Sequence, residues 1–213
     1  MKLSHAVKPV IAGIFCALFC FSIIQTQAQE QKSLSYGNET MGVKISGPKG
    51  WFMTSGEKMK EIATKGLNDL NPVDSIKESV EKIGPLVAFS QFPLGSPREV
   101  NPNISLATET LPKEYIKTAM DYANASILTM KTMLKDTKVI KEPTPVTLSG
   151  KEGVSFTYEG TVVKGYLEMR IKSSIYVFVK GDLVYALAYV NQAASFDNNL
   201  KDFEESLNTF VLK

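Results

Sequence analysis

The spacing of apolar residues changes along the chain from a period of two to a helical period and back. Alternation over residues 41–46, 86–92 and 102–111 predicts three strands, because successive side chains of a strand point to opposite faces. Most segments after residue 135 also alternate. Among them, the Lys-Gly-Asp turn at 180–182 separates two apolar runs and predicts a tight hairpin. Strands joined by short turns favour an antiparallel sheet.

Four other segments repeat their apolar residues with a helical period. They are residues 56–70, 71–85, 111–136 and 195–212. Helices placed among hairpin-linked strands predict an α+β protein, in which helices pack on a largely antiparallel sheet. The longest segment has one apolar stripe, formed by Ile116, Ala119, Met120, Ala123, Ile127, Met130 and Leu134.

The hairpin over residues 174–190 is apolar on both of its faces. Strands of this kind are central and covered on each side, which predicts a sandwich with helices on both faces of the sheet. One alternative concerns its tyrosines. If the cover on one side were incomplete, Tyr176, Tyr185 and Tyr189 would form a surface that binds a partner.

The first 28 residues have the three parts of a secretory signal peptide. A basic start precedes an apolar run at 9–24, and Thr26 and Ala28 are the small residues expected before a cleavage point. The apolar run is short for a membrane span, although an uncleaved anchor is the alternative. A phenylalanine precedes each cysteine, which argues against a lipoprotein.

We therefore expect an exported protein, periplasmic or secreted, whose signal peptide is cleaved near Ala28 and which is not an integral membrane protein afterwards. Residues 29–35 are polar and are predicted to be disordered. Residues 36–213 are long enough for one domain with its own core and show no internal repeat.

The predicted signal peptide also contains the residue types on which much catalysis depends. It holds the only histidine, both cysteines, two of the 24 basic residues and none of the 22 acidic ones, so the remainder is formally neutral. That remainder lacks the base of Ser-His-Asp and Cys-His systems and the usual ligands of zinc and copper. Its neutral charge gives no electrostatic reason to bind nucleic acid. The sequence thus predicts no enzyme activity, no cofactor, no metal and no nucleic-acid partner.

Trp51, the only tryptophan, follows a Gly-Pro-Lys-Gly turn and either closes a core or stacks on a ligand. Because tryptophan is buried on average, we favour the core. The loop at 92–103 is the strongest candidate for binding, because loops on rigid scaffolds commonly hold functional residues. We select Arg98, Glu99 and Asn101 within it, while a proline-stiffened connector is the alternative.

A set of turn and core positions is spread along residues 36–212. It consists of Pro48, Gly50, Trp51, Asn101, Pro102, Asn103, Ile104, Leu148, Gly150, Gly153, Phe156, Tyr158, Ser206, Leu207 and Phe210. These positions resemble those of the PsbP-like superfamily, which includes chloroplast PsbP proteins, a Ran-binding nuclear-import factor and exported bacterial domains of the DcrB type. The resemblance implies an α/β/α sandwich and a non-enzymatic adaptor, assembly factor or chaperone.

These observations predict an exported accessory protein without enzymatic activity, which binds another protein or a membrane-associated complex. A carrier of a small molecule or lipid is the alternative, with an apolar pocket between the helix at 113–134 and the sheet. A third hypothesis, an enzyme that uses only Asp, Glu, Lys or Tyr, would need two ionisable groups in one cleft.

Overall fold

The computed structural model describes residues 34–70, 84–96, 100–111, 116–164 and 166–213, with only the backbone described for residues 63, 65–70 and 164. Its helices are α2 (Gly56–Leu70), α4 (Ala119–Met133) and α5 (Leu200–Asn208), with a 3-10 segment, η1 (Ala193–Asn199), before α5. The strands are β1 (Ser35–Asn38), β2 (Val43–Ser46), β3 (Phe52–Ser55), β4 (Gly84–Ser90), β5 (Asn103–Thr110), β6 (Lys135–Leu148), β7 (Lys151–Lys164), β8 (Leu167–Lys180), β9 (Leu183–Gln192) and β10 (Val211–Leu212).

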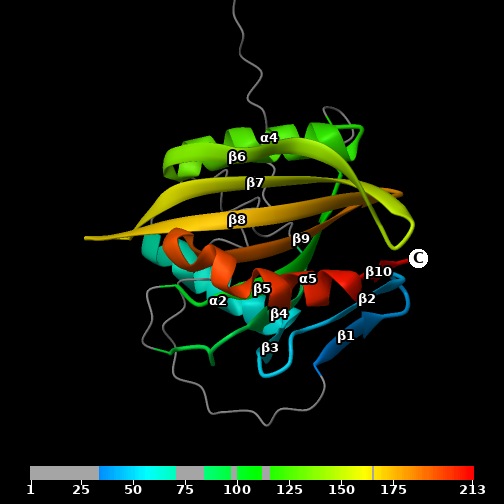
Figure 1. Cartoon of the computed structure of the whole chain (residues 1–213), viewed down its shortest axis with the longest axis horizontal. Coiled ribbons are helices and arrows are strands. Elements are labelled where there is room, and N and C mark those ends of the chain that lie inside the picture. The colour runs from blue at the N-terminus through cyan, green and yellow to red at the C-terminus, as the bar shows by residue number, and fades with distance from the viewer. Residues whose placement is uncertain (1–33, 71–83, 97–99, 112–115, 165) are drawn as a thin grey trace, which may run out of the picture.

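The described strands form one large and one small sheet (Figure 1). The seven strands of the large sheet run in the order β3-β4-β5-β9-β8-β7-β6, and all neighbours are antiparallel. The small sheet has the order β1-β2-β10 and is also antiparallel. The α+β class and the antiparallel sheet predicted from the sequence are therefore confirmed.

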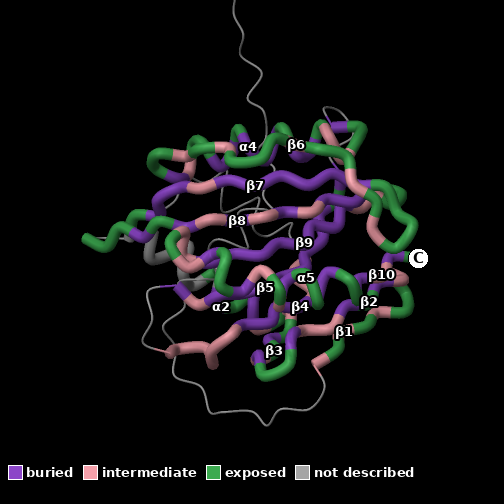
Figure 2. The backbone as a smooth tube through the Cα atoms, viewed as in Figure 1, coloured by how far each residue is buried: buried purple, intermediate pink, exposed green. Residues whose placement is uncertain are grey.

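The central strands of the large sheet are buried on both faces, as their purple colour in Figure 2 shows. One face packs with α2 and α4 in a first core, and the other packs with α5, η1 and the small sheet in a second core. Every residue of β9 between its two ends is buried, as expected for a central strand covered on both sides. The sandwich is confirmed, with the difference that the small sheet shares the second face with α5.

The longest predicted helix, 111–136, is observed as α4 and begins only at Ala119. A capping box sets this start. The hydroxyl of Thr118 accepts a hydrogen bond from the Asp121 N–H at 3.1 Å, and the Asp121 carboxylate accepts one from the Thr118 N–H at 3.0 Å. Both donors would otherwise be unpaired at the helix start. Residues 112–115 of the predicted helix lie outside the described residues.

The other predicted helices have different outcomes. The helix over 56–70 is confirmed as α2 with the same bounds. The helix predicted over 71–85 lies outside the described residues, apart from its last two, which begin β4. The closing helix predicted over 195–212 is only in part helical, because η1, α5 and β10 share that span. No helix in the described part of the chain is long and apolar enough to cross a membrane.

Two local predictions from the sequence are confirmed. Gly181, with φ +61°, forms the tight turn between β8 and β9, where Lys180 pairs with Leu183. Trp51 is 3% exposed and belongs to the second core. It follows Gly50, whose φ of +88° favours glycine. The tryptophan thus closes the core rather than facing solvent.

β6 forms one edge of the large sheet and contains Pro143 and Pro145. Proline has no backbone N–H, so an edge strand tolerates it where a central strand does not. The pairing of β6 with β7 also shifts register three times between Lys135 and Thr144. Prolines and bulges both disfavour the pairing of an edge strand with another chain.

Gly56, at the start of α2, lies against β4. A Cβ at this position would be 1.9 Å from the backbone oxygen of Pro85, whereas a Cβ at Gly37 would meet nothing within 4 Å. We expect Gly56→Ala to lower the free energy of unfolding by about 2 kcal/mol, although alanine favours helices. Gly37→Ala should change it by less than about 0.5 kcal/mol. Urea unfolding followed by circular dichroism measures both, and equal stability of the two variants would contradict this packing.

Candidate functional site

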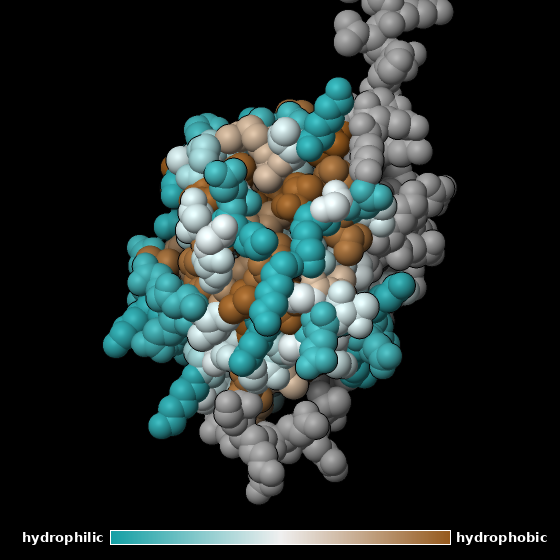
Figure 3. Space-filling view, turned by 90° about the vertical axis from the view of Figure 1, so that its right-hand side faces the viewer, coloured by the Kyte–Doolittle hydropathy of each residue, from teal (hydrophilic) through white to brown (hydrophobic). Residues whose placement is uncertain are grey.

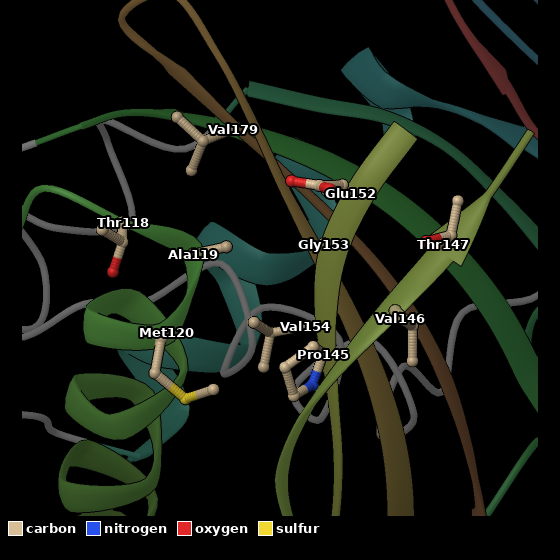
Figure 4. A pocket seen from close by; sticks show the side chains of 10 residues that line it. All are labelled: Thr118, Ala119, Met120, Pro145, Val146, Thr147, Glu152, Gly153, Val154 and Val179. Carbon is tan, nitrogen blue, oxygen red and sulfur yellow. The ribbon is translucent and has the colours of Figure 1, made fainter. Parts of the chain in front are cut away.

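The strands beneath α4 are longer than the helix that covers them. α4 has 15 residues and spans about 22 Å at 1.5 Å per residue. β6, β7 and β8 have 14 residues each and would span about 46 Å at roughly 3.3 Å per residue. The strands therefore extend past the first turn of α4. A pocket, called here the α4 pocket, lies at this end (Figure 4).

The α4 pocket has a volume of about 510 Å³ and opens to solvent. Most of its side chains are apolar. In Figure 4, Met120 points from the helix across the pocket toward Pro145 and Val154. The described residues that line it are Thr118, Ala119, Met120, Pro145, Val146, Thr147, Glu152, Gly153, Val154 and Val179. The pocket therefore combines the start of α4 with the adjoining ends of three strands.

The register of the β6–β7 hairpin brings these side chains to one face. Pro145 lies opposite Val154, and Thr147 lies opposite Glu152. Residues opposite each other on paired strands point to the same face. The pairing of β7 with β8 places Val179 on the far side of β7, where it also lines the pocket.

Polar and apolar groups contribute nearly equally to the surface of the α4 pocket. Thr118 is at the helix start, with its hydroxyl engaged in the capping box. Glu152 is exposed and is the one ionisable side chain among the described lining residues. In Figure 4 its carboxylate points toward Val179. The arrangement can hold an apolar group and, beside it, a positive charge.

Figure 3 faces the side of the molecule where α4 begins and where the β6–β7 hairpin turns. Brown, apolar side chains are spread over the middle of this face, with teal, hydrophilic and white ones between and around them.

The loop selected from the sequence does not contribute to the α4 pocket. Arg98 and Glu99 lie outside the described residues. Asn101 is half-buried, and its side chain holds the base of the loop. Its Oδ1 accepts a hydrogen bond from the Phe92 N–H at 3.1 Å, and its Nδ2 donates one to the Phe92 carbonyl at 2.8 Å. Both polar atoms of Asn101 are thus used within the chain.

The three tyrosines selected from the sequence lie on the second core, away from the α4 pocket. Tyr185 and Tyr189 are fully buried there, and Tyr176 is half-buried with its ring 5.7 Å from that of Phe203 in α5. The Tyr189 hydroxyl donates to the Phe196 carbonyl at 2.9 Å. Because α5 and η1 cover this face, Tyr185 and Tyr189 act as core residues and form no exposed surface.

A buried polar pair holds α4 on the sheet. The hydroxyl of Tyr122 in α4 donates a hydrogen bond to Glu109 Oε2 in β5 at 2.5 Å, and both side chains are buried. A buried polar group costs free energy unless it is hydrogen-bonded, and this bond pairs both side chains. This bond lies one turn from Ala119 and Met120, so it also fixes the helical wall of the α4 pocket.

Neither Glu152 nor the valines of the α4 pocket were selected from the sequence. The carrier hypothesis did place a pocket between the long helix and the sheet, but not its residues. The signal that could have found them is the Ser149-Gly150 turn, where both residues have positive φ. Alternation counted outward from that turn places Thr147 and Glu152 on the same face. Within the described residues, no group of three or more His, Cys, Asp or Glu could hold a metal ion.

Burial raises the pKa of Tyr189 to about 12, and burial also raises the pKa values of Tyr176 and Tyr185. The folded protein therefore holds these protons more tightly than the unfolded chain. The resulting stabilisation is complete below the pKa of an unfolded tyrosine, about 10, and is lost as pH rises through about 12.

We expect the free energy of unfolding to fall between pH 8 and pH 11, and to fall less in Tyr189→Phe. At pH 8 this variant should be about 1 kcal/mol less stable, because the hydrogen bond to Phe196 is lost. Tyr166→Phe, at an exposed position, is the control and should follow the unmodified protein. Urea unfolding at each pH tests this, and parallel pH profiles for Tyr189→Phe and the unmodified protein would refute it.

No family model and no curated protein matches the chain. Among solved structures, it is similar to cyanobacterial PsbP (CyanoP) from Synechocystis sp. PCC 6803, with 14% identity, 90% of this chain and 99% of that chain covered, and a TM-score of 0.49. It is also similar to PA94, a protein of unknown function and putative regulator from Pseudomonas aeruginosa (13% identity, 59% and 81% covered, TM-score 0.43). A third is LpqN of Mycobacterium tuberculosis, which is involved in cell envelope biogenesis (10% identity, 62% and 80% covered, TM-score 0.41). These similarities concern the fold alone.

Proposed function

We propose that this chain is an exported accessory protein, which acts by binding another protein or a membrane-associated complex and not by catalysis. The α4 pocket is the observation that carries the proposal, because it is an open pocket with both apolar and polar groups on the paired strands of the large sheet. Export is supported by the basic, apolar and small-residue segments of the first 28 residues.

The openness of the α4 pocket favours a protein as its occupant. Sites for small ligands usually bury about 70–90% of the ligand surface. A small molecule in this pocket would remain exposed on the solvent side. An apolar side chain from a partner protein would bring the rest of the partner to cover that side, as interface anchors do.

The walls of the α4 pocket are held in place before any partner binds. β7 pairs with β8 from Gly153 opposite Phe178 to Lys164 opposite Leu167, and its first residues pair with β6, with Glu152 opposite Thr147. The capping box fixes the start of α4 on the other side. A preformed site loses little conformational freedom on binding, so more of the contact energy contributes to affinity.

A carrier of a small apolar molecule or lipid is the second candidate function. The volume of about 510 Å³ favours it, since ligand sites typically measure roughly 300–1,000 Å³. The two functions differ in what accompanies the purified protein. A carrier retains a small molecule, whereas an accessory protein retains or captures another protein.

A photoreactive amino acid at Thr147, on the pocket face of β6, should crosslink to one dominant envelope or secreted protein in the native host. The same group at Leu128, on the exposed side of α4, should not. Ala119→Phe fills the pocket from the helix and should abolish the crosslink. Asn124→Phe adds the same ring to an exposed helix position and should leave the crosslink intact. Equal products from Thr147 and Leu128, or a product that persists in Ala119→Phe, would count against the proposal.

Native mass spectrometry of the purified protein tests the carrier function separately. We expect the mass of the polypeptide alone, because an open pocket leaves a small molecule exposed. A bound small molecule that is absent from Ala119→Phe and present in Asn124→Phe would instead establish the carrier function.

A further inference from the structure

The charge at the mouth of the α4 pocket specifies the chemistry of its partner. We propose that the partner inserts a large apolar side chain into the pocket and places a lysine or arginine against Glu152. This inference rests on the proposed function, in which the pocket binds a protein. It adds to the proposed function that the partner segment is positively charged, and it states where in that segment the charge lies.

Glu152 differs from other carboxylates on the same strands. Glu159 of β7 pairs with Arg170 at 3.0 Å, and Glu168 of β8 pairs with Lys135 at 2.9 Å. Within the described part of the chain, Glu152 forms no ion pair. Its carboxylate therefore presents a negative charge at the α4 pocket, and opposite charges across an interface favour binding.

The distance between Glu152 and the apolar residues beside it indicates which sequence pattern to expect in the partner. Glu152 and Val154 are two residues apart on β7 and line the same pocket. Two residues of a strand span about 6.6 Å. Side chains two positions apart on an extended peptide also share a face and have this spacing. An extended partner segment, with its basic residue two positions from its apolar anchor, matches this spacing.

A display library of random decapeptides, selected on the full folded domain, tests the inference. The unmodified protein and the control Asn124→Phe should enrich peptides that carry a large apolar residue with Lys or Arg two positions away. Ala119→Phe should not enrich them, because its ring occupies the pocket. Circular dichroism of each variant confirms that it is folded before selection.

Glu152→Gln removes the charge and leaves the pocket in place. We expect this variant to retain the apolar anchor among its selected peptides, while basic residues return to their library frequency. The Kd of one selected peptide should rise roughly two- to fivefold, the range for a solvent-exposed ion pair. Glu142→Gln, which removes an exposed carboxylate outside the pocket lining, is the matched control and should change neither result.

The outcomes separate the two proposals. Peptides with an apolar anchor but no basic preference, or with an acidic one, would overturn this inference and leave the α4 pocket as a protein-binding site. If Ala119→Phe enriches the same peptides as the unmodified protein, the pocket itself is not the binding site, and the proposed function and this inference both fail.

Discussion

Burial of β9 on both faces is the constraint on which the rest of the structure depends. Every residue between its ends is buried, so exposing either face would place apolar surface in water. β5 and β8 cover its edges, α2 and α4 cover one face, and α5, η1 and the small sheet cover the other. The three-layer arrangement follows, and the edges of the sheet fall on β3 and β6, far from the centre.

The α4 pocket arises from the same arrangement, at the place where cover ends. Strands rise more than twice as far per residue as helices, so one helix cannot cover strands of nearly the same residue count. β6, β7 and β8 support one another by pairing and extend beyond the first turn of α4. The result is an open pocket on paired strands, with one carboxylate at its mouth. The proposed binding function rests on this pocket.

Much of the fold could be predicted because its signals are local. The helix at 56–70, the turn at 180–182 and the burial of Trp51 each depend on a few neighbouring residues. The residues of the candidate site were harder to predict from the sequence. Asn101 is used within its own loop, and Tyr189 is buried against η1, because an apolar or polar pattern does not say which element will cover it. The late start of α4 depends on the Thr118–Asp121 capping box, which apolar periodicity does not detect.

The sequence by itself determined the α+β class, the antiparallel hairpins and the two-sided burial of the central strands, because periodicity and turn residues act over short distances. It also determined the residue types present, and with them the chemistry open to the chain. Only the tertiary structure decided which of these residues lie together in one site. The α4 pocket joins residues 118–120, 145–147, 152–154 and 179, which are distant along the chain. They meet because strand register and the start of one helix, taken together, leave one end of the sheet uncovered.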